Sequence, residues 1–505
     1  MIKLIYRIES DYMSKKRMLI VTSVTLSVVT ISLGIVKLYQ IYALSNYIGT
    51  VTDTGIDVYI NDDSYASIPA NGSSNVYYML TNTNPGTVKY GVAYQTTSGV
   101  TVKVYDTSED PATGTIEEND KKYIKLHLEN KNSTNKTIEL STVLGYENGG
   151  DLVVPSGVTL VTDTYTPPPT AAEYITKLYT TASKTTVTNN SITYNTAPSV
   201  SLMNDRLGGT TTDLDGGNIR YYGASPNNYI YFNCSDYSNQ TSSTCETWRI
   251  IGVFDGKLKL IRGSQIGTYS WDNKNTSTGA ENDAGKNDWT TARLMKLLNP
   301  SDYYIADSND NGLGQSLYYN SASGKCYSGE NNATVDCDFT STGIKNDETK
   351  NMIAETTYNL GGWNSNTVYP NLMYEKERGT TVYTGRPTTP WTGKIALAYT
   401  SDYGYAADLN QCKDKTLYDY NNSTCTSNNW MKAIITNNGS NSGWLLTPYC
   451  STSSNVWYVY PVGNVYFNYT VYSAFGAVPV LSLSSELGIE SGGDGSSSNP
   501  YKLSA

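Results

Sequence analysis

Apolar and polar residues alternate early in the chain, between residues 53 and 163. In "GIDVYIN", Ile56, Val58 and Ile60 fall on one side of an extended backbone, and "NVYYML", "VKYGVAY" and "YIKLHLEN" repeat the pattern. Alternation of this kind is typical of half-buried strands, and turn signals such as "NTNPGT" separate the runs. These short strands predict an antiparallel, immunoglobulin-like β-sandwich over 53–163, with the role of a stalk.

Three consecutive prolines follow this region, in "DTYTPPPTAAEY". Because a polyproline run is stiff and extended, residues 164–170 are predicted to be a linker between two domains. The following residues, "AAEYITKLYTTASK", are predicted to form a short helix with Thr170 as its N-cap.

The region 171–490 is rich in Tyr, Asn, Ser, Thr and Gly and is periodic in few places. One is a predicted β-hairpin, with strands at 248–253 and 257–261 around an Asp-Gly turn. Another is a predicted helix in "NDWTTARLMKLLNP", which aligns three leucines and ends at Pro300. We therefore expect a loop-rich α+β domain over 171–490 and a C-terminal tail over 491–505.

A mostly apolar, uncharged run at residues 18–36 follows three cations at 15–17. At about 1.5 Å per helical residue, its length approaches the hydrocarbon thickness of a bilayer. The cations favour a cytoplasmic N-terminus. The sequence thus predicts a cytoplasmic tail over 1–17, a single transmembrane anchor over 18–44, and a cell-membrane protein with its C-terminal part outside. Cleavage as a signal peptide is the alternative, because "YALSN" offers a small-x-small site.

Six of the seven cysteines fall into three local pairs, each closing a short polar loop. This spacing favours disulfide bonds over a zinc site, which more often uses Cys-x-x-Cys. Reduced, buried thiols are the alternative. Disulfide bonds imply an oxidising, extracytoplasmic compartment. The predicted disulfide cysteines are Cys234 with Cys245, Cys326 with Cys337, and Cys412 with Cys425, which leaves Cys450 unpaired.

Composition and charge argue against several function classes. A net charge of −10 without a basic stripe argues against nucleic acid as a partner. The single histidine, His127, is expected on the outer face of a strand, and one histidine cannot supply a His-rich metal site. We expect no enzyme, no catalytic residues and no metal site. The oxygen-rich segments "DSNDNG" at 307–312 and "DLDGG" at 213–217 make calcium a candidate cofactor, although solvated turns are the simpler interpretation.

Tyrosine dominates the aromatic residues, with 45 Tyr against 5 Phe. Because each buried tyrosine hydroxyl needs a hydrogen-bond partner, this excess predicts a large, partly solvated aromatic surface. The densest stretch, "SNVWYVYPVGNVYFNYTVYSAFGAVPVL" at 454–481, contains no charged residue. It is predicted to form a hairpin in which Gly463 is the left-handed residue of the turn.

Rigid, amphipathic rings beside small polar residues are typical of antibody-like binding surfaces. We therefore interpret the hairpin as a binding surface, with a buried sheet core as the alternative. The predicted ligand-binding residues are Tyr449, Trp457, Tyr458, Tyr460, Tyr466, Phe467, Tyr469 and Tyr472.

Several segments carry repeated Trp-plus-turn motifs. "CETWRIIGVFDGKLKLIRG", "NDWTTARLMKLLN" and "WLLTPYC…VWYVYPVGNVYF…GAVPVL" resemble an uncharacterised family of bacterial surface proteins. Its terminal motif is similar to that of the C-type-lectin-like fold of formylglycine-generating enzymes and of retroelement variable proteins. The resemblance covers roughly residues 171–485, and Val478 stands where the family usually has Arg. It implies a structural framework of Trp444, Pro448, Gly463, Gly476 and Pro479.

Nearly every residue from Tyr449 to Phe475 can be reached from an Asn codon by replacing its adenines, which is the process that diversity-generating retroelements use. The favoured function is adhesin-like or receptor-like binding of an extracellular protein or glycan by a lectin-like domain that such a process would diversify. The alternative is a structural surface or appendage protein that self-assembles through its tyrosines.

Overall fold

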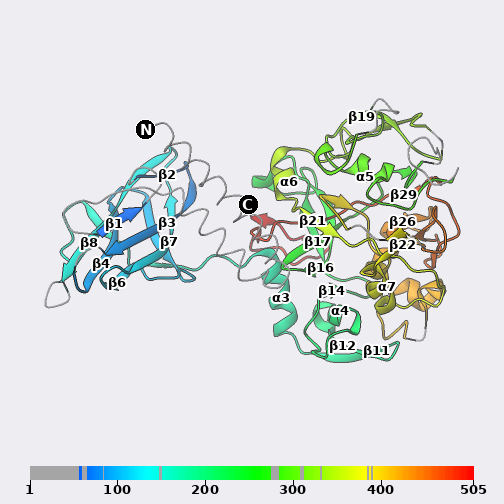
Figure 1. Cartoon of the computed structure of the whole chain (residues 1–505), viewed down its shortest axis with the longest axis horizontal. Helices are drawn as coiled ribbons and strands as arrows, with labels where there is room; N and C mark the ends of the chain where they lie inside the picture. Colours follow the sequence, from blue (N-terminus) through cyan, green and yellow to red (C-terminus); the bar gives the residue numbers. More distant parts are fainter. Residues whose placement is uncertain are drawn as a thin grey trace, which may run out of the picture. The chain divides into compact units, whose positions relative to one another are not determined.

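The computed structural model describes residues 56–59, 65–82, 85–146, 151–273, 284–306, 312–329, 332–383, 386–387, 390–413 and 415–504. The chain divides into two compact units between Pro167 and Pro168 (Figure 1). The predicted anchor over 18–44 lies outside the described residues. Among the residues that are described, no helix is long and apolar enough to cross a membrane. The expected transmembrane helix and single-pass membrane location are therefore not supported by the described residues.

The first unit consists of two β-sheets that share one apolar core. One sheet has the strand order β1-β3-β7-β5-β10; the other has the order β2-β8-β4-β6, with β9 beside β4. Alternation along β3 buries Val76, Tyr78 and Leu80, while the positions between them stay half exposed. The strands are β1 Ile56–Tyr59, β2 Tyr65–Ile68, β3 Gly72–Asn82, β4 Val88–Gln95, β5 Val100–Tyr105, β6 Thr113–Ile116, β7 Lys121–Asn130, β8 Lys136–Tyr146, β9 Val158–Leu160 and β10 Thr164–Tyr165.

The second unit is built mainly from two larger sheets. One has the order β11-β12-β13-β14-β16-β17-β30-β25, with β15 beside β16, and the other has the order β18-β29-β26-β27-β28. The strands of these two sheets are β11 Thr185–Asn189, β12 Ile192–Ala197, β13 Leu202–Asn204, β14 Ile219–Tyr221, β15 Tyr229–Phe232, β16 Glu246–Phe254, β17 Lys257–Arg262, β18 Thr268–Tyr269, β25 Ile395–Ala396, β26 Gly443–Pro448, β27 Val456–Val459, β28 Val465–Tyr466, β29 Phe475–Gly476 and β30 Val480–Ser482.

The remaining elements of the second unit are short. Its strand pairs are β19 Ser323–Cys326 with β20 Val335–Asp338, β21 Thr356–Tyr358 with β24 Trp391–Gly393, β22 Thr381–Tyr383 with β23 Arg386–Pro387, and β31 Gly488–Ile489 with β32 Leu503–Ser504. Its helices are α3 Ala171–Thr181, α4 Arg206–Gly209, α5 Arg293–Leu298, α6 Asp347–Met352, α7 Pro370–Glu377, α8 Thr400–Tyr405, α9 Ser423–Ser427 and α10 Trp430–Ile435.

The expected α+β lectin-like class is wrong, because the described structure is mostly β-sheet with few helices. The helix expected before Pro300 shows the reason. Only the six residues of α5 are helical, and all six are buried. The leucines therefore form part of a core instead of one face of a long amphipathic helix. Residues 491–504, expected as a tail, carry β32 and the buried Tyr501 and pack within the second unit.

Several local predictions are confirmed. Thr170 caps α3 with a capping box, in which its hydroxyl accepts from the Glu173 amide and the Glu173 carboxylate accepts from the Thr170 amide. Strands β16 and β17 form the hairpin around Asp255 and Gly256. All three expected disulfide bonds are present, and Cys450 is not in a disulfide.

His127 lies on the outer face of β7, opposite the core-facing leucines on either side of it, but it is buried because Tyr165 of β10 covers it. The two rings stack with centroids 3.6 Å apart, and His127 Nδ1 lies 2.9 Å from Asn75 Oδ1. Burial lowers the pKa of His127 below 6.5; Glu129 opposes this shift and Lys103 adds to it.

We expect acid to destabilise the first unit through His127. The unfolded histidine takes up a proton as the pH falls through about 6.5, whereas the folded one stays neutral to lower pH, so the unfolding free energy falls in that window. As the chain has one histidine, its ring signals in an NMR titration give the folded pKa directly. A folded pKa at or above the ordinary value would contradict this prediction, and His127→Gln should remove the pH dependence.

Candidate binding face

Strand β27 is an inner strand of its sheet, between β26 and β28, and both of its faces are covered. Val456 and Tyr458 pack into one apolar cluster, while Trp457 and Val459 pack into another on the opposite side. Trp457 and Tyr458 expose 0% and 1% of their surface. These two residues were predicted to contact a ligand, and the structure corrects this, because no ligand can reach them without opening the core.

Some residues of the hairpin turn and of the segment beyond β28 are accessible instead. Tyr460, Val462 and Tyr469 expose 42%, 51% and 47% of their surface. The ring of Tyr469 contacts the buried ring of Tyr458 at a centroid distance of 5.6 Å, and the ring of Tyr460 contacts that of Tyr466 at 5.8 Å. Of the eight predicted binding residues, Tyr460 and Tyr469 therefore point to solvent most clearly.

A residue that the sequence did not indicate extends this surface. Tyr418 lies in the loop closed by the Cys412–Cys425 disulfide, and its ring contacts that of Tyr466 with centroids 4.7 Å apart. The cysteine pairing shows that this loop is closed, but no local pattern shows which strand it faces. We define the tyrosine face as Tyr418, Tyr460, Val462, Tyr466, Asn468 and Tyr469.

Neighbouring residues fix Tyr418 on both sides. Leu417 is buried, and its amide donates to the Val368 carbonyl at 2.8 Å. Tyr420 is also buried, with its hydroxyl 3.5 Å from the Gly404 carbonyl. With Leu417 and Tyr420 anchored on either side of it, Tyr418 presents its ring to the hairpin at little cost in conformational entropy.

The hairpin turn is held against the same loop through Gly463. Gly463 has a φ of 105°, which confirms the prediction that it is the left-handed residue of the turn. A Cβ at this residue would lie 2.7 Å from Thr426 Cγ2. The Gly463 carbonyl accepts a hydrogen bond from the hydroxyl of Tyr403 in α8. The turn can approach this closely only because the residue lacks a side chain.

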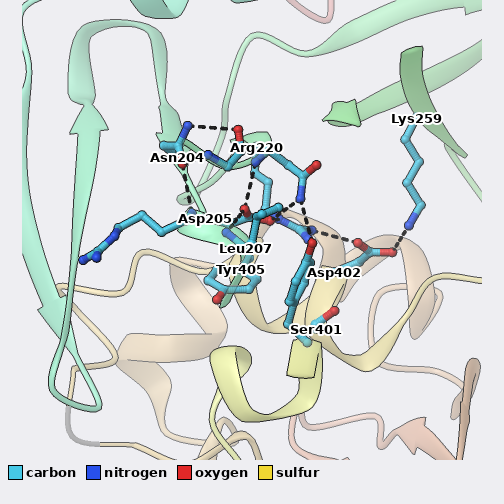
Figure 2. A network of polar contacts seen from close by, with 12 residues as sticks. Asn204, Asp205, Leu207, Arg220, Lys259, Ser401, Asp402 and Tyr405 are labelled. Carbon is cyan, nitrogen blue, oxygen red and sulfur yellow. Dashed lines mark hydrogen bonds and ion pairs between the residues drawn. The ribbon is translucent and has the colours of Figure 1, made fainter. Parts of the chain in front are cut away.

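Helix α8 is in turn fixed by a cluster of buried charges (Figure 2). The Asp402 carboxylate binds Arg220 at 2.8 Å and also Lys259, and Arg220 binds Asp205 at 2.6 Å. Burial alone would raise the pKa of Asp402, but Lys259 and Arg220 overcome it and hold the pKa at about 2. The four charges join β14, β17 and α8 to the loop after β13.

The other predicted residues are half-buried. Tyr449 stacks on Phe467 with centroids 4.1 Å apart, and both lie against Trp457 on the side of the sheet opposite Tyr458. Tyr472 is half-buried as well. The residues expected as framework, namely Trp444, Pro448, Gly463, Gly476 and Pro479, are all buried.

The face is polar but nearly free of charge. Residues 433–485 include no ionisable acid or base apart from tyrosine hydroxyls and Cys450, whose thiol pKa is raised by burial. Asp419, an exposed acid in the disulfide loop, accepts a hydrogen bond from Thr416 at 2.7 Å. Such a surface suits a ligand without net charge.

Neither calcium candidate is supported by a described cluster. Most of the 307–312 segment lies outside the described residues. In the 213–217 segment, Asp215 accepts bonds from Tyr179 and Asn195, and Asp213 accepts from the Asp215 amide. Within the described ranges no group of three His, Cys, Asp or Glu could hold a metal ion.

The chain was compared with known proteins by family and by sequence. No protein-family model matches it, and no curated protein matches it either. The resemblance to the bacterial surface-protein family therefore stays a prediction.

We expect Asp402→Asn to lower the unfolding free energy by about 3–5 kcal/mol, because it leaves the buried cations Arg220 and Lys259 without their shared anion. Chemical denaturation of the full chain measures this change. Asp347→Asn is the matched control: it removes an exposed carboxylate that pairs with Lys350 at 3.3 Å, and it should change stability little. Equal effects of the two substitutions would contradict the assigned role of Asp402.

We expect the double substitution Cys412→Ser with Cys425→Ser to lower stability by about 2–4 kcal/mol and to loosen the loop that carries Tyr418. Hydrogen exchange at residues 417–420 should accelerate. The matched control, Cys326→Ser with Cys337→Ser, opens a different loop and should leave exchange at 417–420 slow. Unchanged exchange in the first variant would show that the disulfide does not position Tyr418.

Proposed function

We propose that this chain is a non-enzymatic binding protein of an oxidising compartment, and that it recognises a neutral glycan through the tyrosine face. The observation that carries the proposal is the exposure of Tyr460 and Tyr469 on an uncharged aromatic hairpin whose central strand is buried. Three disulfide bonds support the assignment to an oxidising compartment.

A glycan suits this face for two reasons. The apolar C–H faces of sugar rings pack on aromatic rings, while tyrosine hydroxyls and the exposed Asn468 can exchange hydrogen bonds with sugar hydroxyls. The rings are also held in place before binding, because Tyr460 and Tyr466 lie next to a closed turn and Tyr418 is anchored by its disulfide loop. A preorganised surface loses less entropy when it binds.

A glycan array with the full chain tests the proposal, followed by titration calorimetry on the best neutral glycan. Tyr460→Ala and Tyr469→Ala should each weaken binding about tenfold or more, equivalent to about 1.4 kcal/mol. Tyr65→Ala is the control, because Tyr65 is 53% exposed but lies in the first unit. The control should bind as the unmodified chain does.

Other outcomes would separate the alternatives. Binding that survives both substitutions would place the ligand elsewhere. Concentration-dependent assembly that is lost in the same two variants, without glycan binding, would favour the structural or appendage function. Capture of a protein ligand without glycan binding would assign the face to protein recognition.

A further inference from the structure

Tyr418 and Tyr466 form a close pair of partly exposed tyrosines. Their ring centroids lie 4.7 Å apart with an interplanar angle of 50°. The pair joins two segments that are far apart in sequence: the disulfide loop and strand β28. Solvent reaches both rings, because neither residue belongs to the buried core.

The two rings lie within contact distance of one another. The Tyr466 hydroxyl interacts with that of Tyr418 and raises the pKa of Tyr418. Each phenol oxygen is flanked by two ortho carbons, so at this ring separation an ortho carbon of one ring can meet an ortho carbon of the other. The 50° angle between the rings suits directly bonded phenols, since coplanar rings would press their ortho substituents together.

From this geometry we propose that Tyr418 and Tyr466 are a site of oxidative modification, at which a one-electron oxidant of the peroxidase type joins them as dityrosine. The ligand-binding proposal is not needed for this inference.

The chemistry balances with hydrogen peroxide as the terminal oxidant. Each phenol loses one electron and one proton and becomes a tyrosyl radical. The two radicals combine by forming a bond between their ortho carbons, and the hydrogen on each of these carbons moves to the oxygen, which restores two phenols. One peroxide molecule takes up the two electrons and two protons and leaves as two water molecules. The protein loses two hydrogen atoms in total.

A second tyrosine pair provides an internal comparison. Tyr105 and Tyr165 in the first unit have centroids 4.9 Å apart, but their rings meet edge to face at 78°. Tyr105 is buried, and its hydroxyl donates to Asn75 Oδ1 at 2.8 Å. With one hydroxyl turned away and buried, this pair should not couple although its distance is similar.

Cross-linking would have a structural consequence. The Cys412–Cys425 disulfide closes the loop on itself but does not attach it to the hairpin. A bond between Tyr418 and Tyr466 would make that attachment covalent and fix one edge of the tyrosine face.

The full chain, at low concentration, is treated with hydrogen peroxide and a haem peroxidase. We expect dityrosine fluorescence, a monomer whose intact mass is lower by two hydrogen atoms, and a cross-linked peptide that contains both Tyr418 and Tyr466. Tyr418→Phe and Tyr466→Phe keep the rings and should each lose most of the fluorescence. Tyr65→Phe, at a more exposed position, should lose none.

Peptide mapping of the oxidised chain without substitutions decides whether Tyr418 and Tyr466 are joined, even if a variant folds poorly. A cross-link at Tyr105–Tyr165, dityrosine found only between molecules, or fluorescence that persists in both Phe variants would overturn the assignment. Absence of any cross-link under conditions that oxidise free tyrosine would overturn it as well.

Discussion

The buried ion pairs of Asp402 connect helix α8 to the large sheet of the second unit. The Asp402 carboxylate binds two cations from the large sheet, Lys259 in β17 and Arg220 in β14. Arg220 also binds Asp205. Buried ions are costly to remove from water, so the cluster is stable only with every partner in place. That requirement fixes the position of α8 against the large sheet. Through Tyr403 and Gly463, α8 then sets where the hairpin turn lies.

The second constraint is that β27 has no face toward solvent. A strand between two neighbours, with an apolar cluster on each side, must carry apolar or aromatic residues at every position. This accounts for "VWYV", and it separates the tyrosine-rich stretch into two functional parts. The strand positions build the core, whereas Tyr460, Val462 and Tyr469, in the turn and after β28, are exposed. The buried hydroxyl of Tyr458 is satisfied locally by Asn468.

Local chemistry was predictable from the sequence. The capping box at Thr170, the Asp-Gly hairpin and the three cysteine pairs each depend on residues close together in the chain. Long-range placement was not predictable in the same way. The uninterrupted apolar pattern of "VWYV" was the available sign of a strand covered on both faces, and it favoured the buried-core alternative for Trp457 and Tyr458. Tyr418 carried no such sign, because its neighbour Tyr466 comes from a distant strand.

The excess of tyrosine over phenylalanine is explained more by the interior than by the surface. Buried tyrosines such as Tyr78 and Tyr90 donate to or share hydrogen bonds with Thr142 and the Pro111 carbonyl, so their hydroxyls connect segments as well as fill space. A chain with few leucines in its C-terminal hairpin can therefore still form a packed core. It follows that substitutions at Tyr460, Val462 or Tyr469 can alter the exposed surface, while the core tyrosines that support it stay the same.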